Sequence, residues 1–392
     1  MAPLLTIDEA LACVLERAHR LPVEDVAVAE TAGRVLAEDA AALVDLPPFD
    51  SSAMDGYAVR SADTPGTLEL HGASAAGLPA GRVLVPGTAV AISTGAVVPE
   101  GADAVVPVER SEARSGSVEV EAVAPGENVR PRGGDARADE ILAAAGTRIG
   151  PALVGALAAG GIASLRCARQ PRVAVLATGT ELRSPGEALA PGQIYESNTA
   201  MVAAQLRRAG AVVESLGIVA DDADATRAAL ERGLAADVLV TSGGVSVGEH
   251  DLVRGLLASL GAEEVFWRVA VKPGKPVAFA TRGPTLVFGL PGNPISSFVG
   301  VELFVRPALL ALQGAREPGP AYRAGRLAAV RRRTPARDEL VRARLVGAAL
   351  LEPLSGQDSH MIARAATADA LVLVPRGDGE LEAGAEVSWL PM

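Results

Sequence analysis

The sequence predicts a multi-domain protein that combines α/β and all-β parts. Its centre is predicted to be a three-layer α/β domain with a mostly parallel sheet, accompanied by a β-rich insertion in the N-terminal half and a small C-terminal β-barrel or sandwich. Three observations predict this class. The chain has 392 residues, 49% of them hydrophobic, enough for roughly two to four compact units. Short apolar pieces broken by Gly and Pro fill 45–146, and apolar runs alternate with helical patterns over 171–312.

The N-terminal half begins with a helix signal. Thr6 and Glu9 form the pattern of a capping box, and apolar residues at helical spacing predict a helix to about His19. The turn-rich texture of 45–146 favours strands. Pro151, which suits a first helical turn, then predicts a second helix over 152–159.

Buried strands and helices alternate from residue 171 onward. Strands are predicted at 172–177, 212–219, 237–240, 265–271 and 285–290, and helices at 199–209, 223–234 and after 294. Apolar-run strands separated by helices indicate a parallel sheet covered on both faces, and ligands of such sheets bind beyond the carboxyl ends of the strands. A Gly/Pro-rich link, 314–320, precedes about seventy residues with alternating apolar positions, which predict the barrel or sandwich.

Composition excludes several classes of protein. The net charge of −11 argues against nucleic acid or an anionic membrane as partner, since both require an extended basic face. No signal peptide is predicted, and the most apolar stretch, 141–165, is too interrupted to span a bilayer. Cys13 and Cys167 have no metal or redox spacing and fit a reducing cytoplasm.

The two lysines are the most informative residues. The chain has 36 basic residues, of which only Lys272 and Lys275 are Lys, and these lie three apart in a turn with Pro and Gly. Where Arg supplies all other positive charge, Lys indicates a need for a compact ammonium group. Two such groups on one rigid loop predict an anion pocket; chance survival of two Lys codons is the alternative.

A small-residue loop, 242–248, follows a predicted buried strand. Backbone N–H groups of such a loop can approach an oxyanion, although an ordinary tight turn is the alternative. Carboxylates beside a phosphate-binding loop suit Mg²⁺, and helix capping is the alternative for Asp222 and Asp251. The acidic residues predicted at this edge are Glu181, Asp221, Asp222, Glu249 and Asp251.

Two further loops stand out. The loop 290–294 holds Asn293, one of three Asn in the chain, between two prolines, and Gly292 permits close approach of a ligand. The segment 47–60 carries two Asp, two Ser and rigid prolines, and could present Asp55 to a neighbouring site. A plain Asp-Gly turn is the alternative there.

Together these motifs resemble the molybdopterin molybdenumtransferase family, which includes bacterial MoeA and the gephyrin E domain. The resemblance spans nearly the whole chain in one order, through 47–60, 92–96, 128–135, 178–182, 242–251, 272–276 and 290–294. It implies an elongated homodimer with four domains per chain. These are a discontinuous helical domain (1–43 and 140–170), a β-rich insertion domain (44–139), an α/β molybdopterin-binding domain (171–315) and a C-terminal β-barrel (316–392).

The resemblance also implies a reaction and its residues. Molybdate is joined to the dithiolene of adenylylated molybdopterin in the cytoplasm, with release of AMP and with Mg²⁺ as cofactor. The implied catalytic residues are Asp55, Asp135, Glu181, Asp221, Lys272 and Lys275. The implied substrate-binding residues are Thr94, Ser242, Gly243, Gly244, Ser246, Pro291, Asn293, Pro294, Arg342 and Ser359, and the implied metal ligands are Glu181, Asp221 and Asp251. Asp55, Thr94 and Asp135 are expected to act across the dimer.

Two residues depart from the family pattern. Thr180 stands where related sequences have an acidic residue, and Arg268, where they have Lys, keeps the charge but not the shape. The nearest alternative function is the preceding step, adenylyl transfer from ATP to molybdopterin, and the enzyme of that step is also a candidate partner. A receptor-binding scaffold like the gephyrin E domain is the other alternative. The 47–60 segment and the C-terminal region favour the molybdenumtransferase, and the lack of a long linker disfavours the scaffold.

Overall fold

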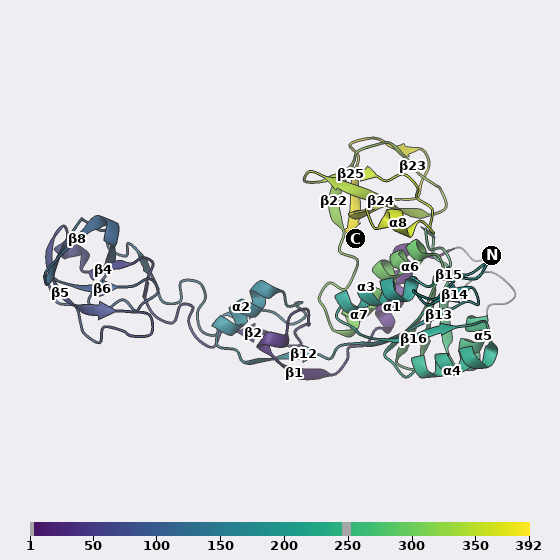
Figure 1. Cartoon of the computed structure of the whole chain (residues 1–392), viewed down its shortest axis with the longest axis horizontal. Helices are drawn as coiled ribbons and strands as arrows, with labels where there is room; N and C mark the ends of the chain where they lie inside the picture. The colour runs from purple at the N-terminus through teal and green to yellow at the C-terminus, as the bar shows by residue number, and fades with distance from the viewer. Residues whose placement is uncertain (1–3, 245–251) are drawn as a thin grey trace.

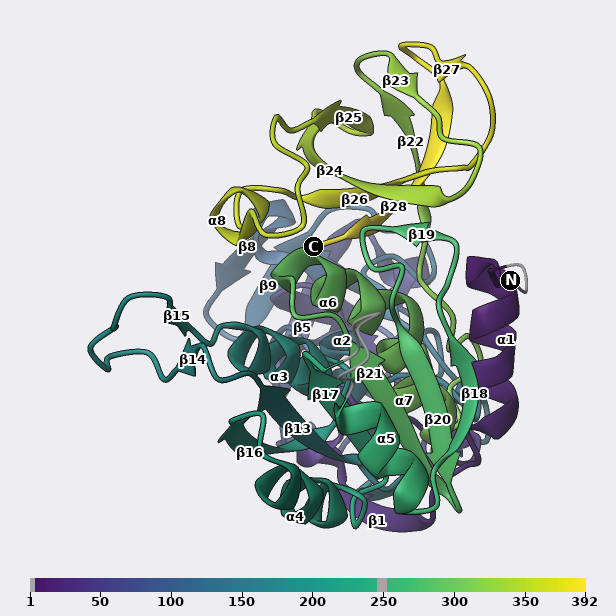
Figure 2. The same cartoon turned by 90° about the vertical axis from the view of Figure 1, so that its right-hand side faces the viewer.

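The computed structural model describes residues 4–244 and 252–392. Figure 1 shows an elongated chain with a β-rich body at one end, a small body around α2 in the middle and an α/β body at the other end. A barrel of C-terminal strands lies against the α/β body (Figures 1 and 2). The predicted multi-domain class is therefore confirmed.

The central sheet is mixed rather than wholly parallel. Its strands lie in the order β16-β13-β17-β21-β20-β18; the first four are parallel neighbours, and β20 and β18 run antiparallel at one edge. β20 was not predicted, although Pro276 precedes it and Gly283 and Pro284 follow it. The bounds are Val212–Val219 (β16), Arg172–Thr178 (β13), Val238–Ser242 (β17), Thr285–Leu290 (β21), Ala278–Arg282 (β20) and Glu263–Trp267 (β18).

The predicted strand 265–271 is wrong in its second half. β18 ends at Trp267, Arg268 adopts a positive φ of 131°, and Val271–Lys272 form a separate strand, β19, which pairs with the barrel strand β24. The chain thus leaves the α/β sheet, contributes two residues to the barrel sheet and returns. Phe266 of β18 and Val271 of β19 are nevertheless buried in the same hydrophobic core, which is why the apolar run continues across both strands.

Helices cover both faces of the sheet, and alternate strand residues enter the two cores. Val173 and Val175 belong to one core with helices α1, α3, α6 and α7, whereas Ala174 and Leu176 belong to the other, with α4 and α5. The bounds are Ile7–Arg17 (α1), Asn198–Arg208 (α3), Ala223–Gly233 (α4), Leu252–Ser259 (α5), Pro294–Gly300 (α6) and Arg306–Leu312 (α7), with a π-helical turn, Val301–Val305 (η4), between α6 and α7.

Over the described ranges, one helical span is long and apolar enough to cross a membrane. Residues Pro294–Leu312 have a mean hydropathy of 1.7, but 83% of the tested window is buried inside the protein. The span is therefore a core helix of the α/β body.

The middle body joins chain segments from both sides of the insertion. β1 (Val23–Ala27) pairs with β12 (Ser164–Ala168), β2 (Ala40–Ala41) pairs with β11 (Ile141–Ala143), and α2 (Pro151–Ala159) packs over them. The middle body thus draws strands from both 1–43 and 140–170, the two segments expected to form a discontinuous domain. The capping-box helix α1 forms as predicted, but its buried face, Ile7, Ala10 and Val14, packs into the α/β core.

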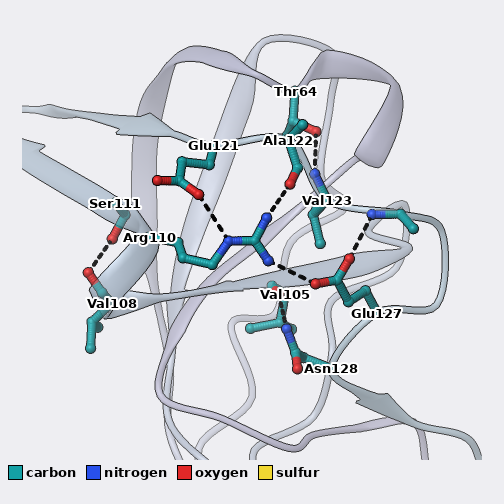
Figure 3. A network of polar contacts seen from close by, with 11 residues as sticks. Thr64, Val105, Val108, Arg110, Ser111, Glu121, Ala122, Val123, Glu127 and Asn128 are labelled. Atoms are coloured by element: carbon teal, nitrogen blue, oxygen red, sulfur yellow. Dashed lines mark hydrogen bonds and ion pairs between the residues drawn. The ribbon is translucent and has the colours of Figure 1, made fainter.

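The β-rich body is a six-stranded sheet in the order β7-β4-β6-β5-β9-β8. Gly56 lies where β4 pairs with β7, and a Cβ there would collide with the Val106 carbonyl. Figure 3 shows how Arg110 binds the loop after β9: its guanidinium donates to Glu121, Glu127 and the Ala122 carbonyl. The bounds are Gly56–Val59 (β4), Gly66–Ser74 (β5), Thr88–Ile92 (β6), Ala104–Pro107 (β7), Ser111–Arg114 (β8) and Ser117–Val120 (β9). A two-residue ladder, β3 (Ser51–Ser52) with β10 (Val129–Arg130), leads back to the middle body.

The C-terminal sheet closes on itself. Its strands run β24-β25-β22-β28-β26, and β26 pairs again with β24, so the barrel alternative is confirmed over the sandwich. The bounds are Arg323–Leu327 (β22), Asp338–Val346 (β24), Leu350–Pro353 (β25), Ala370–Val374 (β26) and Glu386–Pro391 (β28). A short helix, α8 (Ile362–Ala365), and the loop before it face α6.

Candidate functional site

Two adjacent cavities lie at the carboxyl edge of the central sheet. The larger, about 720 Å³, is bordered by the ends of β13, β17 and β21, by α3 and by the barrel residues His360 and Ile362. It brings together eight of the predicted site residues: Glu181, Asp221, Ser242, Gly243, Gly244, Pro291, Asn293 and Pro294. Ligand binding at this edge is what the strand order predicts.

The smaller cavity, about 300 Å³, lies between the α/β body and the barrel. Lys272 and Lys275 line it together with Ser359 of the barrel, and Pro276 and Asn293 border both cavities. Sequence reasoning missed two further cations of this cavity, Arg331 and Arg337. Nothing marked them, because Arg is the ordinary basic residue of this chain. Four cationic side chains around one small space make it suitable for an oxyanion.

One carboxylate forms ion pairs with two of the four cations of the smaller cavity. Glu339, whose side chain is 7% exposed, lies 2.5 Å from Lys272 Nζ and 3.1 Å from an Arg331 nitrogen. Burial alone raises the pKa of Glu339, but the hydrogen bond from Lys272 and the charge of Arg331 outweigh it, so the pKa lies below its usual value. The ion pairs of the described residues include Lys272 but not Lys275, which leaves the Lys275 ammonium group for a ligand.

The glycine-rich loop packs tightly against the end of β13. Gly243 has φ +89°, and a Cβ there would lie 2.6 Å from Thr178 O, so only Gly fits. Its N–H group donates to Leu290 O at 3.1 Å and is therefore not available to an oxyanion. The predicted residues Ser246, Glu249 and Asp251 lie outside the described residues.

Two carboxylates remain at the acidic edge. Glu181 folds back over Gly179, where a Cβ would lie 2.6 Å from its Oε2, and Asp221 Oδ2 accepts a hydrogen bond from Thr180 Oγ1 at 2.9 Å. Asp222 caps α4 by accepting from Ala225 N, which confirms the capping alternative for that residue. Over 4–244 and 252–392 no group of three or more His, Cys, Asp or Glu could hold a metal ion. A divalent ion here would need oxygens from its substrate, as is usual for Mg²⁺.

Arg342 stabilises a loop of the smaller cavity without lining the cavity itself. It is 1% exposed, and its guanidinium donates to the carbonyls of Gly356, Asp358 and Met361. These bonds fix the loop that carries Ser359, whose own carbonyl accepts from Ile295 N at the start of α6. Arg342 therefore lies beneath the lining of the smaller cavity. Arg268 borders neither cavity, and its guanidinium stacks 3.9 Å from the centre of the Trp267 ring.

The predicted residues of the N-terminal half lie far from both cavities within one chain. Asp55 Oδ1 accepts a hydrogen bond from Thr94 N at 2.7 Å, so these two residues form one unit in the β-rich body. Asp135 is bonded through its backbone to Leu46, where the insertion meets the middle body. Figure 1 shows the β-rich body and the α/β body at opposite ends of the molecule.

Sequence reasoning also missed Asn198. Its Nδ2 bridges Ser242 Oγ at 2.8 Å and Gly292 O at 2.7 Å, which ties two loops of the larger cavity together. The available signal was compositional, since Asn198 is one of only three Asn in the chain. Glu196 and His360 line the same cavity.

Three protein-family models match consecutive parts of the chain. They are the MoeA N-terminal region (domain I and II) over residues 5–161, a probable molybdopterin binding domain over 174–311, and the MoeA C-terminal region (domain IV) over 324–392.

Curated proteins and solved structures agree with these matches. The molybdopterin molybdenumtransferase 2 of Mycobacterium tuberculosis is 38% identical over 92% of this chain and 93% of its own length. The molybdopterin molybdenumtransferase of Bacillus subtilis is 39% identical over 78% of this chain and 74% of its own length. A crystal structure of a molybdopterin biosynthesis MoeA protein from Pyrococcus horikoshii has a TM-score of 0.80 at 27% identity and covers 99% of this chain and 100% of its own.

Proposed function

This chain belongs to the MoeA family of molybdopterin molybdenumtransferases, and we propose that it joins molybdate to the dithiolene of adenylylated molybdopterin and releases AMP. The observation that carries the proposal is the pair of cavities with opposite electrostatic character. One is lined by Lys272, Lys275, Arg331 and Arg337, and the other carries Glu181 and Asp221. They meet at Pro276 and Asn293.

The basic cavity is proposed to hold molybdate, a dianionic oxyanion. Lys275 and Arg337 face the ligand as positive charges, and the Ser359 hydroxyl supplies a further donor. Such preorganised donors stabilise developing negative charge without reorganisation, which is often the largest catalytic effect in group transfer. Arg342 is proposed to act as a positioning residue, because it holds the backbone on which Ser359 sits.

The larger cavity is proposed to hold the adenylylated substrate, with Mg²⁺ beside Glu181 and Asp221. Two carboxylates suit Mg²⁺ when substrate phosphates complete its coordination, and the ion neutralises charge on the leaving phosphate. The Thr180 hydroxyl, which stands in place of an acidic residue, orients Asp221 through its hydrogen bond. Chelation by EDTA should stop turnover, and added Mg²⁺ should restore it.

A homodimer is proposed because Asp55 and Thr94 lie at the opposite end of the chain from the cavities. Their participation in the reaction requires a second copy, as does that of Asp135. We further propose that the protein acts in the cytoplasm, where Cys13 and Cys167, both free thiols, stay reduced. Delivery of the substrate by the molybdopterin adenylyltransferase is part of the same proposal.

The test is to incubate the purified protein with adenylylated molybdopterin, molybdate and Mg²⁺ and to measure AMP. Molybdate-dependent AMP release supports the proposal, and its absence with intact substrate refutes it. Release of pyrophosphate from ATP and molybdopterin would instead identify the preceding adenylyl-transfer step. Binding of a receptor tail without any turnover would indicate a gephyrin-like scaffold.

A further inference from the structure

A third cavity lies on the other side of the central sheet, and the proposed reaction does not use it. It has a volume of about 240 Å³ and lies between α5 and the strands β17, β21, β20 and β18. Its walls are mainly apolar, with Val253, Leu257, Phe279 and Val287 among them. β17 separates it from the larger cavity of the proposed active site: Thr241 lines the first and Ser242 the second.

Two polar groups in the walls of this cavity have no hydrogen-bond partner. Within the described part of the chain, both Thr241 Oγ1 and Trp267 Nε1 are buried and unbonded. Thr241 is 0% exposed. A buried donor without an acceptor costs about 1 to 3 kcal/mol, so the Trp267 indole indicates a ligand that would satisfy it. The indole N–H can only donate, so that ligand must present an acceptor.

Water alone is a poor occupant of this space. Most of its wall is apolar, so water inside it finds few protein groups to bond. The charged side chains at the rim form a pair, Arg254 with Glu264 at 2.5 and 2.7 Å. A paired rim offers no net charge to an ion, which favours an uncharged occupant.

We propose that this cavity is a second binding site, for a small uncharged aromatic or heteroaromatic molecule that carries one hydrogen-bond acceptor. The acceptor takes the hydrogen of Trp267 Nε1, and the ring packs against Phe279 and Val287. The site is independent of molybdate and of the adenylylated substrate, because β17 stands between the two binding spaces.

The chain has only two Trp, Trp267 and Trp389, and this permits a direct test on the full-length protein. Protein labelled with ¹⁵N at Trp is titrated with 4-fluoroacetophenone, and the two indole N–H signals are followed by NMR. Trp267→Phe assigns the signals. We expect the Trp267 signal to move saturably and the Trp389 signal, which belongs to the barrel and donates to Ala324 O, to stay. Movement of neither signal, or of Trp389 alone, overturns the proposal.

A matched probe and matched variants test the details. 4-Fluoroethylbenzene lacks the acceptor and should bind about three- to tenfold more weakly, the equivalent of one hydrogen bond. Ala258→Phe, at the cavity mouth, should abolish binding of both probes, whereas Ala228→Phe on the exposed side of α4 should not. Equal affinity of both probes, or unchanged binding in Ala258→Phe, refutes the assigned site.

Discussion

Lys272 Nζ lies 2.5 Å from Glu339 Oε1, across the parallel pairing of β19 with β24 that sets these two residues opposite each other. The ammonium group comes from the α/β body and the carboxylate from the barrel. The ion pair therefore joins two domains at the wall of the basic cavity. It also means that the two lysines differ: among the described residues Lys272 has a carboxylate partner, and Lys275 has none.

Glu339→Gln should lower stability in a pH-dependent manner. The pKa of Glu339 lies below its ordinary value of 4.5 in the folded protein, so the stabilisation is present above pH 4.5 and is lost as the pH falls through the folded-state pKa. The free energy of unfolding should be lower in the variant by about 1 to 2 kcal/mol at neutral pH. The gap should shrink on acidification. Urea unfolding of the wild type and the variant at neutral and at acidic pH measures this difference in stability. A difference that stays constant or grows in acid contradicts a lowered pKa for Glu339.

The same variant should bind molybdate more tightly. Without the Glu339 charge, Lys272 and Arg331 are no longer neutralised beside Lys275, so we expect affinity to rise about three- to tenfold at low ionic strength. High salt should reduce this gain, because Lys272 is half-exposed and its field is screened. Calorimetric titration with molybdate at two salt concentrations measures both effects. Unchanged affinity at low salt would show that the anion does not meet Lys272.

Lys275→Ala should remove turnover while leaving the fold intact. The Lys275 side chain is exposed and lies in the lining of the basic cavity, so its loss affects the ligand rather than a core. We expect AMP release to fall about a hundredfold or more, as for other removed electrostatic groups. Arg207→Ala, an exposed cation on α3, is the charge-matched control and should keep its rate. Wild-type turnover in Lys275→Ala would exclude its role.

Mixing two inactive variants can test whether the site is shared between subunits. Asp55→Ala removes the partner of Thr94 N, and Lys275→Ala damages the other end of the chain. In a heterodimer of the two, one composite site is damaged twice and the other is intact. Statistical exchange should therefore restore about a quarter of wild-type activity. Recovery requires exchange of subunits, which size-exclusion of differently tagged chains verifies. A verified heterodimer without activity would place both residues in one chain's site.

The sequence predicted the α/β layers and the cavity edge because both depend on local patterns. Strands with apolar runs and the small residues at Ser242 to Gly244 are visible without tertiary information. The division of the 265–271 run between two sheets was not visible, since both halves are equally apolar. Arg342 shows the same limit: an Arg can look like a ligand contact, yet only the fold reveals that its donors bind backbone carbonyls. Asn198 was marked by rarity alone, and its bridging role depends on two loops that are distant in sequence.

Two glycine substitutions should have different effects: one should weaken AMP binding and the other should raise stability. Gly243→Ala places a methyl group 2.6 Å from Thr178 O at φ +89°, so the loop at the end of β17 must shift and binding of AMP in the larger cavity should weaken at least about tenfold. Gly155→Ala, in α2, meets no atom within 4 Å and removes a flexible residue from a helix interior, so it should raise stability by about 0.5 to 1 kcal/mol. AMP titration and thermal unfolding of both variants measure these effects. The two changes add the same methyl group. If both variants bound AMP with equal affinity, the close approach of Gly243 to Thr178 would not shape the cavity.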